Sequence, residues 1–230
     1  PEALAMAPGL QVARVSASSW SVASRGFSGF TSNKLLVLMD GRSVYSPAFS
    51  STFWDEQNTL LEDVDRIEVI RGPGATMWGA NAVNGVINII TRKAQDTHGT
   101  LVRFGAGNEE RVLAGGRWGG PISDTASGRM YLTYNDHATN RLAASGADAN
   151  DAWQPAQGGF RLDGAPAGGR EWTLQGDLVH NDGDQILFPY WQDRPPFLAA
   201  VRDQVEVRGG NLLGRFRQEV GAESALTFKA

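Results

Sequence analysis

The chain has 230 residues, a formal net charge of -4 and no cysteine. This composition excludes a disulfide framework and cysteine-ligated metal, and it provides no basic surface for nucleic acid. No apolar run approaches the roughly 18 residues of a membrane helix. A barrel strand, however, shows only about ten residues of alternating polarity and would escape that criterion.

Residues 1–95 are predicted to form a small α+β domain. Residues 35–39 are an uninterrupted apolar run that ends at Asp40-Gly41, which predicts a strand buried on both faces and then a turn. Residues 60–64 indicate one short helical turn before a strand over 66–70. The chain opens without a signal-peptide pattern and ends within a predicted strand, so we expect a segment of a longer protein.

The glycine-rich segment 66–93 predicts a strand–turn–strand block. A P-loop is the competing interpretation, because Gly74 and Gly79 have its spacing. That motif needs Lys and then Ser or Thr after its second glycine, and Ala80-Asn81 stand there instead. A dinucleotide fingerprint fails as well, since Gly74 is not followed by a glycine three residues later. We therefore predict no nucleotide site and no cofactor.

From about residue 99 the sequence alternates between apolar and polar residues with period two. Seven antiparallel strands are expected, at residues 101–107, 111–119, 129–137, 160–163, 172–178, 211–217 and from 226 onward. Short and long connections mostly alternate along the chain. The short ones are predicted at about 120–127, 165–170 and 220–224, and the long ones at about 138–156 and 182–206. Short turns on one rim and long loops on the other are typical of an outer-membrane β-barrel. A soluble sandwich, which also alternates, is the competing interpretation.

Several elements resemble, in order, the plug domain of TonB-dependent outer-membrane receptors. They are Arg25-Gly26-Phe27, Leu36–Gly41, Asp65–Pro73, Trp78–Ala82 and Gly85–Thr91. The resemblance implies that residues 1–95 are a plug inside a barrel of about 22 strands, and that a TonB complex moves this plug. Residues 96–230 would then be the N-terminal part of the barrel, incomplete at about seven strands. The family's TonB box is not visible in residues 1–10, so no residue is assigned to TonB contact.

The resemblance also implies ion pairs between the plug and the barrel. Arg25 and Arg71 match plug arginines that meet acidic barrel residues, and Glu68 is a third candidate. A guanidinium inside a filled barrel needs fixed acceptors, and such a pair defines register more reliably than it adds stability. The alternatives are that the arginines cap carbonyls within the plug, and that Glu68 pairs with Arg66 or Arg71 or stays solvated.

Ligand contact is expected from the outward tip of the plug, residues 27–33 and 44–54, and from the long loop 182–206. Aromatic side chains there would suit stacking on a planar or iron-chelate ligand, although they could equally pack against the barrel. The candidates are Phe27, Phe30, Tyr45, Phe49, Phe53, Trp54, Tyr190 and Trp191.

No catalytic or metal site is predicted. His98, His137 and His180 have no second ligand at metal spacing. Residues 181–184 resemble a calcium loop only superficially, because the bidentate glutamate is missing, and a solvated turn is expected. No G-x-S-x-G elbow occurs, so we expect no enzyme.

The predicted function is that of a receptor and transporter in the Gram-negative outer membrane, with a ferric siderophore as the leading choice of nutrient. Its predicted partners are the TonB complex, a siderophore-like ligand and outer-membrane lipid, with no nucleic acid. A signal-transducing receptor and a cobalamin or saccharide receptor are alternatives. A soluble α+β binding protein is a further, more distant alternative.

Overall fold

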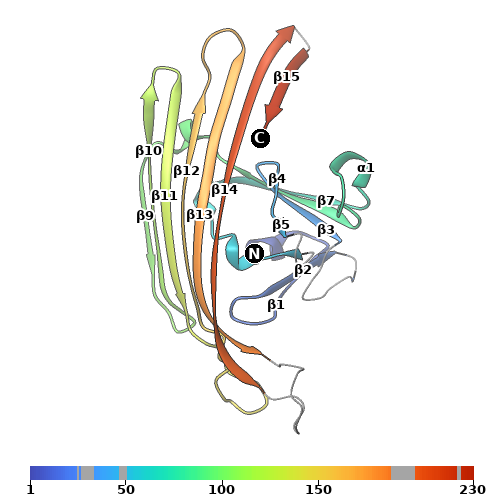
Figure 1. Cartoon of the computed structure of the whole chain (residues 1–230), viewed down its shortest axis with the longest axis vertical. Coiled ribbons are helices and arrows are strands. Elements are labelled where there is room, and N and C mark those ends of the chain that lie inside the picture. The colour runs from blue at the N-terminus through green and yellow to red at the C-terminus, as the bar shows by residue number, and fades with distance from the viewer. Residues whose placement is uncertain (25, 27–33, 47–50, 188–199, 222–223) are drawn as a thin grey trace.

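The computed structural model describes residues 1–24, 26, 34–46, 51–187, 200–221 and 224–230. A tall seven-stranded antiparallel sheet carries a group of shorter elements against one of its faces (Figure 1). We call this sheet the wall, and the elements built from residues 1–91 the plug. Among the described residues, no helix is long and apolar enough to cross a membrane.

The plug is built on a four-stranded sheet in the order β4-β3-β8-β7. Its strands are β3 (Leu35–Met39), β4 (Arg42–Ser43), β7 (Val64–Arg71) and β8 (Gly85–Thr91). Two further pairs are β1 (Leu10–Arg14) with β2 (Trp20–Ser24), and β5 (Tyr45–Ser46) with β6 (Ser51–Thr52). The helical turns are η1 (Glu2–Met6), η2 (Trp54–Glu56), η3 (Leu61–Asp63) and α1 (Ala75–Trp78). The predicted α+β plug is confirmed, with little helix.

Strand β3 lies inside the plug sheet because its side chains are apolar in both directions. All five of its residues are buried, and it runs parallel to β8 and antiparallel to β4. It ends in a two-residue turn at Asp40 and Gly41, whose φ angles of 50° and 78° are both positive, as a type I′ turn requires. The predicted buried strand and its turn are therefore confirmed.

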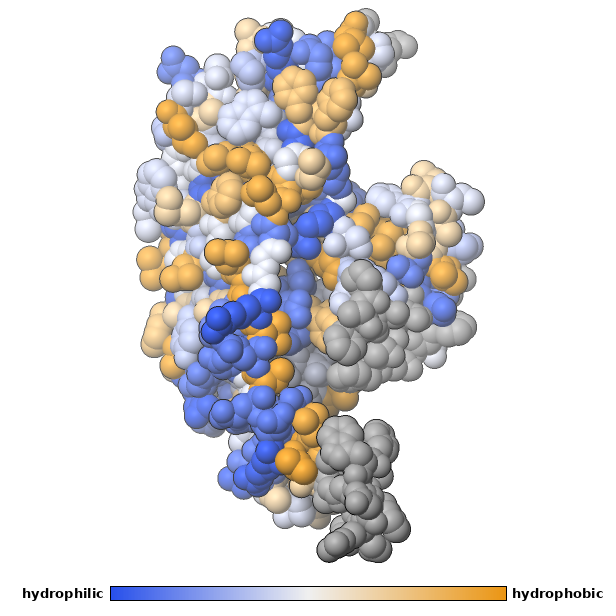
Figure 2. Space-filling model, in the orientation of Figure 1, coloured by the Kyte–Doolittle hydropathy of each residue, from blue (hydrophilic) through white to orange (hydrophobic). Residues whose placement is uncertain are grey.

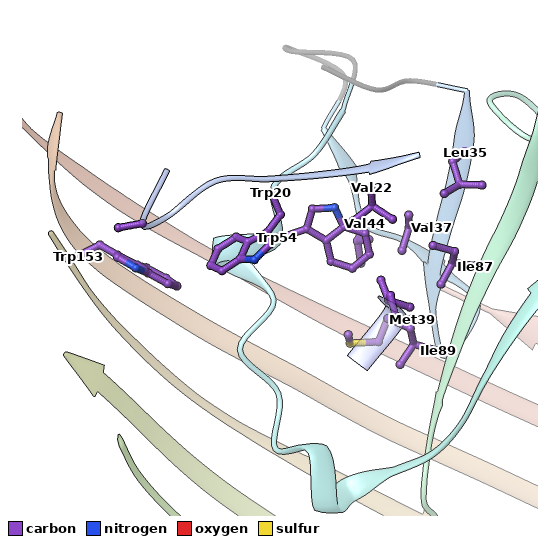
Figure 3. Packing of buried hydrophobic residues seen from close by; sticks show 12 residues of the cluster. Trp20, Val22, Leu35, Val37, Met39, Val44, Trp54, Ile87, Ile89 and Trp153 are labelled. Atoms are coloured by element: carbon purple, nitrogen blue, oxygen red, sulfur yellow. The ribbon is translucent and has the colours of Figure 1, made fainter. Parts of the chain in front are cut away.

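The plug core continues into the wall through one tryptophan. Figure 3 shows Val37 and Met39 of β3 beside Ile87 of β8, and the cluster extends through further tryptophans to Trp153 of the wall. Burying these side chains supplies apolar stabilisation. Among the described residues, Trp153 is the wall member of this cluster, so the apolar core of the plug reaches the wall there.

The wall is a meander in which each strand pairs with the next along the chain. Its strands are β9 (Gly99–Gly105), β10 (Glu110–Ser123), β11 (Ala126–His137), β12 (Trp153–Gly164), β13 (Arg170–Leu187), β14 (Val201–Gly221) and β15 (Ser224–Lys229). A short turn of helix, η4 (Ala94–Thr97), connects β8 to β9. The prediction of about seven antiparallel strands is confirmed.

Several wall strands continue further than predicted. Strand β13 runs through residues 181–184, which were expected to form a solvated turn, and β14 begins at Val201 inside the predicted loop. In this ladder Asp182 lies opposite Glu206, and Asp184 opposite Gln204. Main-chain hydrogen bonds hold a ladder whatever side chains it carries. Polar composition is therefore a poor guide to where these strands end.

The two faces of the wall differ as the alternation predicts. The face toward the plug buries polar side chains, among them Arg129, Thr133, Asn135, Gln157, Arg161 and Asn181. The opposite face exposes large apolar side chains, among them Val102, Phe104, Met130, Leu132, Leu178, Leu212 and Phe228. In Figure 2, hydrophobic side chains gather over the middle and upper wall and hydrophilic ones toward its lower end. An apolar outer face and a charged inner face are typical of barrel strands in lipid.

Candidate functional site: the plug–wall interface

Asp63 of the plug holds two arginines of the wall. It ends η3, and it is 1% exposed. Arg117 of β10 donates a hydrogen bond from Nη1 to Oδ1 of Asp63, and Nε of Arg129 in β11 lies 3.7 Å from Oδ2. Arg129 also donates from Nη1 to the main-chain oxygen of Arg92 at 2.8 Å. Because these charges are withdrawn from water, removing Asp63 would leave two buried arginines without their carboxylate partner.

A second charged cluster forms around Asp40, at the turn after β3. The Asp40 carboxylate accepts hydrogen bonds from the main-chain nitrogen and the hydroxyl of Thr91, at 2.9 and 2.8 Å, and from Nε2 of Gln175 at 2.9 Å. Nη1 of Arg161 lies 3.6 Å from Oδ2 of Asp40 and donates to the Thr91 hydroxyl at 2.8 Å. The cluster therefore ties the ends of β3 and β8 to β12 and β13.

Asp163 completes this cluster from the wall. Its carboxylate accepts hydrogen bonds from Nε of Arg161 and from the hydroxyl of Thr173, each at 2.7 Å. The main-chain N–H of Ala94 in η4 donates to the same carboxylate at 2.7 Å. Arg161 thus lies between a plug carboxylate and a wall carboxylate, which offsets the cost of burying its charge.

Asn58 of the plug contacts the wall through uncharged hydrogen bonds. Its main-chain N–H donates to Oε1 of Gln157 at 2.7 Å, and its carbonyl oxygen accepts from the Thr133 hydroxyl at 3.1 Å. Its side-chain amide donates to the Thr133 hydroxyl at 3.3 Å and accepts from Nδ2 of Asn135 at 3.1 Å. All four polar groups of Asn58 are therefore bonded to the wall, which fixes the loop before η3.

Asp55 in η2 adds a titratable group to the interface. Nδ2 of Asn181 in β13 donates to its Oδ2 at 3.4 Å. Burial raises the pKa of the Asp55 carboxyl to about 6, and the neighbouring Glu56 charge also raises it, against the opposing effect of hydrogen bonds from its own main chain and from Asn181. The charge on Asp55 therefore changes near pH 6, while a wall strand contacts it.

An aromatic contact lies at the end of the wall where β12 begins. The Trp153 and His137 rings are stacked, with centroids 4.4 Å apart and an interplanar angle of 8°. Trp20 of the plug meets Trp153 edge to face, with centroids 5.7 Å apart. Nearby, the main-chain N–H of Ala17 donates to Oδ2 of Asp151 at 2.7 Å. These contacts fix the N-terminal strand pair of the plug against the wall.

Neither Glu68 nor Arg71, two of the three residues predicted to pair the plug with the barrel, forms an ion pair with a described wall residue. Glu68 pairs within the plug: it accepts hydrogen bonds from Nε of Arg66 at 2.8 Å and from Nδ2 of Asn88 at 2.9 Å. The physical reason is geometric, since residues two apart share a strand face, and Asn88 is the register partner of Glu68 on β8. Arg71 is exposed and forms no ion pair with any other described residue. Arg25 lies outside the described residues.

The aromatic ligand-contact candidates divide into three groups. Trp54 is 8% exposed and belongs to the plug core, so its ring has little surface left for a ligand. Tyr45 and Phe53 are half-buried and keep part of their surface exposed. The others lie outside the described residues: Phe27, Phe30, Phe49, Tyr190 and Trp191.

Among the described residues, the buried ion pairs of the interface are the reverse of those predicted, whereas the more exposed pair of Arg14 on the plug with Glu109 on the wall has the predicted polarity. The acids, Asp40 and Asp63, are on the plug, and the buried arginines are on the wall. A signal for the arginines is present in the sequence, because Arg117 and Arg129 lie next to the apolar, outward-facing Trp118 and Met130 and must therefore face inward. The carboxylates carry no comparable signal, since they lie at a turn and at the end of a helical turn.

Comparison with known proteins identifies the same family that the sequence resembles. The family model of the TonB-dependent Receptor Plug Domain matches residues 1–86. The Vitamin B12 transporter BtuB of Vibrio cholerae is 32% identical over 174 residues, covering 73% of this chain and 26% of that protein. The Iron-regulated outer membrane virulence protein of Vibrio cholerae is 38% identical over 114 residues, covering 45% and 18%. The Ferric enterobactin receptor of Pseudomonas aeruginosa is 34% identical over 119 residues, covering 45% and 16%.

Solved structures agree on the fold. The FrpB iron transporter from Neisseria meningitidis superposes with a TM-score of 0.72 at 17% identity, covering 98% of this chain and 36% of that one. P. aeruginosa FpvA superposes with a TM-score of 0.70 at 19% identity, covering 96% and 30%. The chain thus spans about a quarter or less of the length of the curated relatives described above. It belongs to the TonB-dependent receptors of the outer membrane.

Proposed function

We propose that this protein is a receptor for a ferric siderophore, which crosses the outer membrane when the TonB complex moves the plug. We propose no catalytic role for it. The observation that carries the proposal is the seating of the plug on the charged inner face of a wall whose outer face is apolar. A wall of this kind suits a lipid environment, and in a closed barrel the plug on its inner face would occupy the route across the membrane.

The chemistry of the interface supports a plug that moves. Separating two apolar surfaces in water costs about 25 cal/mol for each Å² exposed. Charges such as Asp63 and Arg117 regain their hydration when water enters, and this hydration offsets much of the lost ion-pair energy. An interface made mainly of ion pairs and amide contacts can thus be specific while the plug is seated and still separate under force.

The choice of a ferric siderophore is supported by the iron-related names of two relatives, the iron-regulated virulence protein and the ferric enterobactin receptor. Tyr45 and Phe53 are the described ligand-contact candidates that keep exposed ring surface. Aromatic faces of this kind suit a planar iron chelate.

Vitamin B12 is the second candidate ligand, and a specific observation favours it. The Vibrio cholerae vitamin B12 transporter matches 73% of this chain in sequence, whereas the two iron-related relatives named above each match 45%. The longer match includes wall strands as well as the plug, so the B12 class has to be tested beside the siderophore class.

The test is a ligand titration of the full-length receptor in detergent, followed by tryptophan fluorescence. Ferric enterobactin and vitamin B12 are the two probes, and free tryptophan corrects for light absorption by each. We expect saturable quenching by the ferric siderophore and none by its iron-free form. Tyr45→Ala should weaken that quenching, whereas the control Leu142→Ala, in the connection between β11 and β12, should leave it unchanged.

Each other outcome has a definite meaning. Saturable quenching by vitamin B12 alone would transfer the assignment to the second candidate. Identical titrations for Tyr45→Ala and Leu142→Ala would remove Tyr45 from the ligand site while leaving the ligand class intact. Absence of binding by either probe would contradict both proposals.

A further inference from the structure

A group of charged side chains lies on the outer face of the wall, on the neighbouring strands β13 and β14. His180 and Asp182 are two residues apart on β13, and Glu206 lies opposite Asp182 on β14. Their strand positions share a face with Leu178, which is 74% exposed, whereas the intervening Asn181 is buried toward the plug. The group therefore lies beside the apolar outer surface and away from the plug–wall interface.

The three side chains converge closely enough to share one ion. Nε2 of His180 lies 3.1 Å from Oδ2 of Asp182, and Nδ1 of His180 lies 3.7 Å from Oε1 of Glu206. One ligand atom from each residue can be chosen so that all three lie within 4.8 Å of one another. Asp182 and Glu206 also line a cavity of about 520 Å³, together with Asp184 and Gln154, which leaves room for an ion and its waters.

We propose that His180, Asp182 and Glu206 bind a divalent transition-metal ion such as Zn²⁺. One imidazole nitrogen with two carboxylate oxygens is a donor set that suits Zn²⁺, whereas Ca²⁺ and Mg²⁺ prefer oxygen alone. A single ring nitrogen takes the metal, so one carboxylate must rotate toward it. Both carboxylates are exposed and able to do so. Three protein ligands leave a further coordination position for water.

Arg208 is the competitor for this site. It lies opposite His180 on β14, and its Nε donates to Oε1 of Glu206 at 2.6 Å. A metal ion must displace this guanidinium before it can use the Glu206 carboxylate. Replacing Arg208 with Gln should therefore tighten metal binding, an effect that a nonspecific attraction of cations to surface carboxylates would also produce. The histidine variant below separates these two cases.

The test is isothermal titration of the full-length receptor in detergent with ZnCl₂. We expect His180→Ala to weaken one Zn²⁺-binding event by at least about tenfold, since loss of even an outer-shell partner costs about 10- to 100-fold. Asp182→Asn and Glu206→Gln should each weaken the same event. His98→Ala is the matched control, because the exposed His98 bonds to Ser127 at 2.9 Å, outside this group.

Two results would overturn the proposal. One is an equal Zn²⁺ titration for His180→Ala and His98→Ala. The other is Ca²⁺ binding with the same affinity as Zn²⁺ binding that depends on Asp182 but not on His180. That result would mean that the carboxylates alone bind the cation. Thermal denaturation without metal checks that each variant folds, and the exposed Asp182 and Glu206 variants carry the test if His180→Ala does not fold. Siderophore binding has a separate readout, so the two proposals stand or fall independently.

Discussion

Asp63 shows how single residues hold the plug in place. One carboxylate serves two arginines from adjacent strands, Arg117 and Arg129, and all of these groups are largely shielded from water. A buried pair of this kind adds little net stability compared with apolar packing, but losing one partner is costly. Its contribution is mainly to register, because Arg117 and Arg129 reach η3 from two adjacent strands at once.

Asp63→Asn should destabilise the seated plug strongly. The amide cannot neutralise Arg117 and Arg129, and an uncompensated buried charge costs about 3 to 5 kcal/mol. The matched control is Glu68→Gln, which breaks the more exposed pair with Arg66 and should cost less than about 1 kcal/mol. Thermal unfolding of the full-length receptor in detergent, followed by tryptophan fluorescence, compares them. Equal transition temperatures would show that Asp63 does not hold the plug.

Asp55 makes the seating of the plug depend on pH. Burial raises the pKa of the Asp55 carboxyl in the folded state to about 6, well above the ordinary value for an aspartate. The folded protein therefore holds this proton more tightly, so stability falls as pH rises from about 4 to 6 and then stays level. Asp55→Asn should remove this loss and be more stable than the wild type at pH 7, by about 1 to 3 kcal/mol.

The measurement is the unfolding free energy of the wild type and Asp55→Asn between pH 4 and pH 7. The difference between the two proteins should grow with pH up to about 6. Groups that do not interact with Asp55 cancel in this difference. A difference that is constant with pH would mean that Asp55 does not titrate as its burial implies.

At the scale of elements, those strands and turns could be predicted whose formation depends on the local pattern of residues. The apolar run of β3 and the Asp40-Gly41 turn could be predicted because burial on both faces and positive φ leave direct marks in the sequence. The alternation of the wall strands could be predicted for the same reason. We propose that the domain boundary lies at about residue 95, within η4, where the plug chain passes into the wall.

Contacts between distant strands could not be predicted from the sequence. Asp63 with Arg117, and His180 with Glu206, depend on a register that is set by the whole sheet and by how the plug is seated on it. The extra length of β13 and β14 could not be predicted from the sequence for a related reason. These residues carry polar side chains on a strand held by main-chain bonds, so hydropathy does not mark them.

Gly85 tests the plug sheet as an element. A Cβ at this position would collide with the main-chain oxygen of Ile70 on β7 and approach Cδ1 of Leu35 on β3 at 3.2 Å. The oxygen belongs to the β7–β8 ladder and cannot turn away, so Gly85→Ala should cost at least about 1 to 3 kcal/mol. Gly214→Ala is the control, because a Cβ there meets open space. Equal thermal stability of the two variants would contradict the close packing of β7 on β8.

At the scale of the whole molecule, the wall separates two environments. Its inner face contacts the plug through charges and amides, and its outer face exposes leucine, phenylalanine, valine and methionine side chains. In water such a surface would be a liability for a folded domain. In a lipid bilayer it is the favourable face, and the inner charges are then satisfied only while the plug is seated or water fills its place.

Leu132→Arg tests this division directly. Leu132 lies in the middle of β11 on the outer face and is 63% exposed, so in water an arginine there would cost little. In a bilayer the same charge should destabilise the folded receptor by about 2 to 4 kcal/mol, because we expect the middle of an apolar strand face to lie near the midplane. Leu142→Arg is the matched control, in the connection between β11 and β12 and 46% exposed. Urea titration of each receptor folded into phospholipid vesicles measures the difference. An equal loss of unfolding free energy in both variants would mean that this face of β11 does not contact lipid. A loss confined to Leu132→Arg fits a face that contacts the hydrocarbon core.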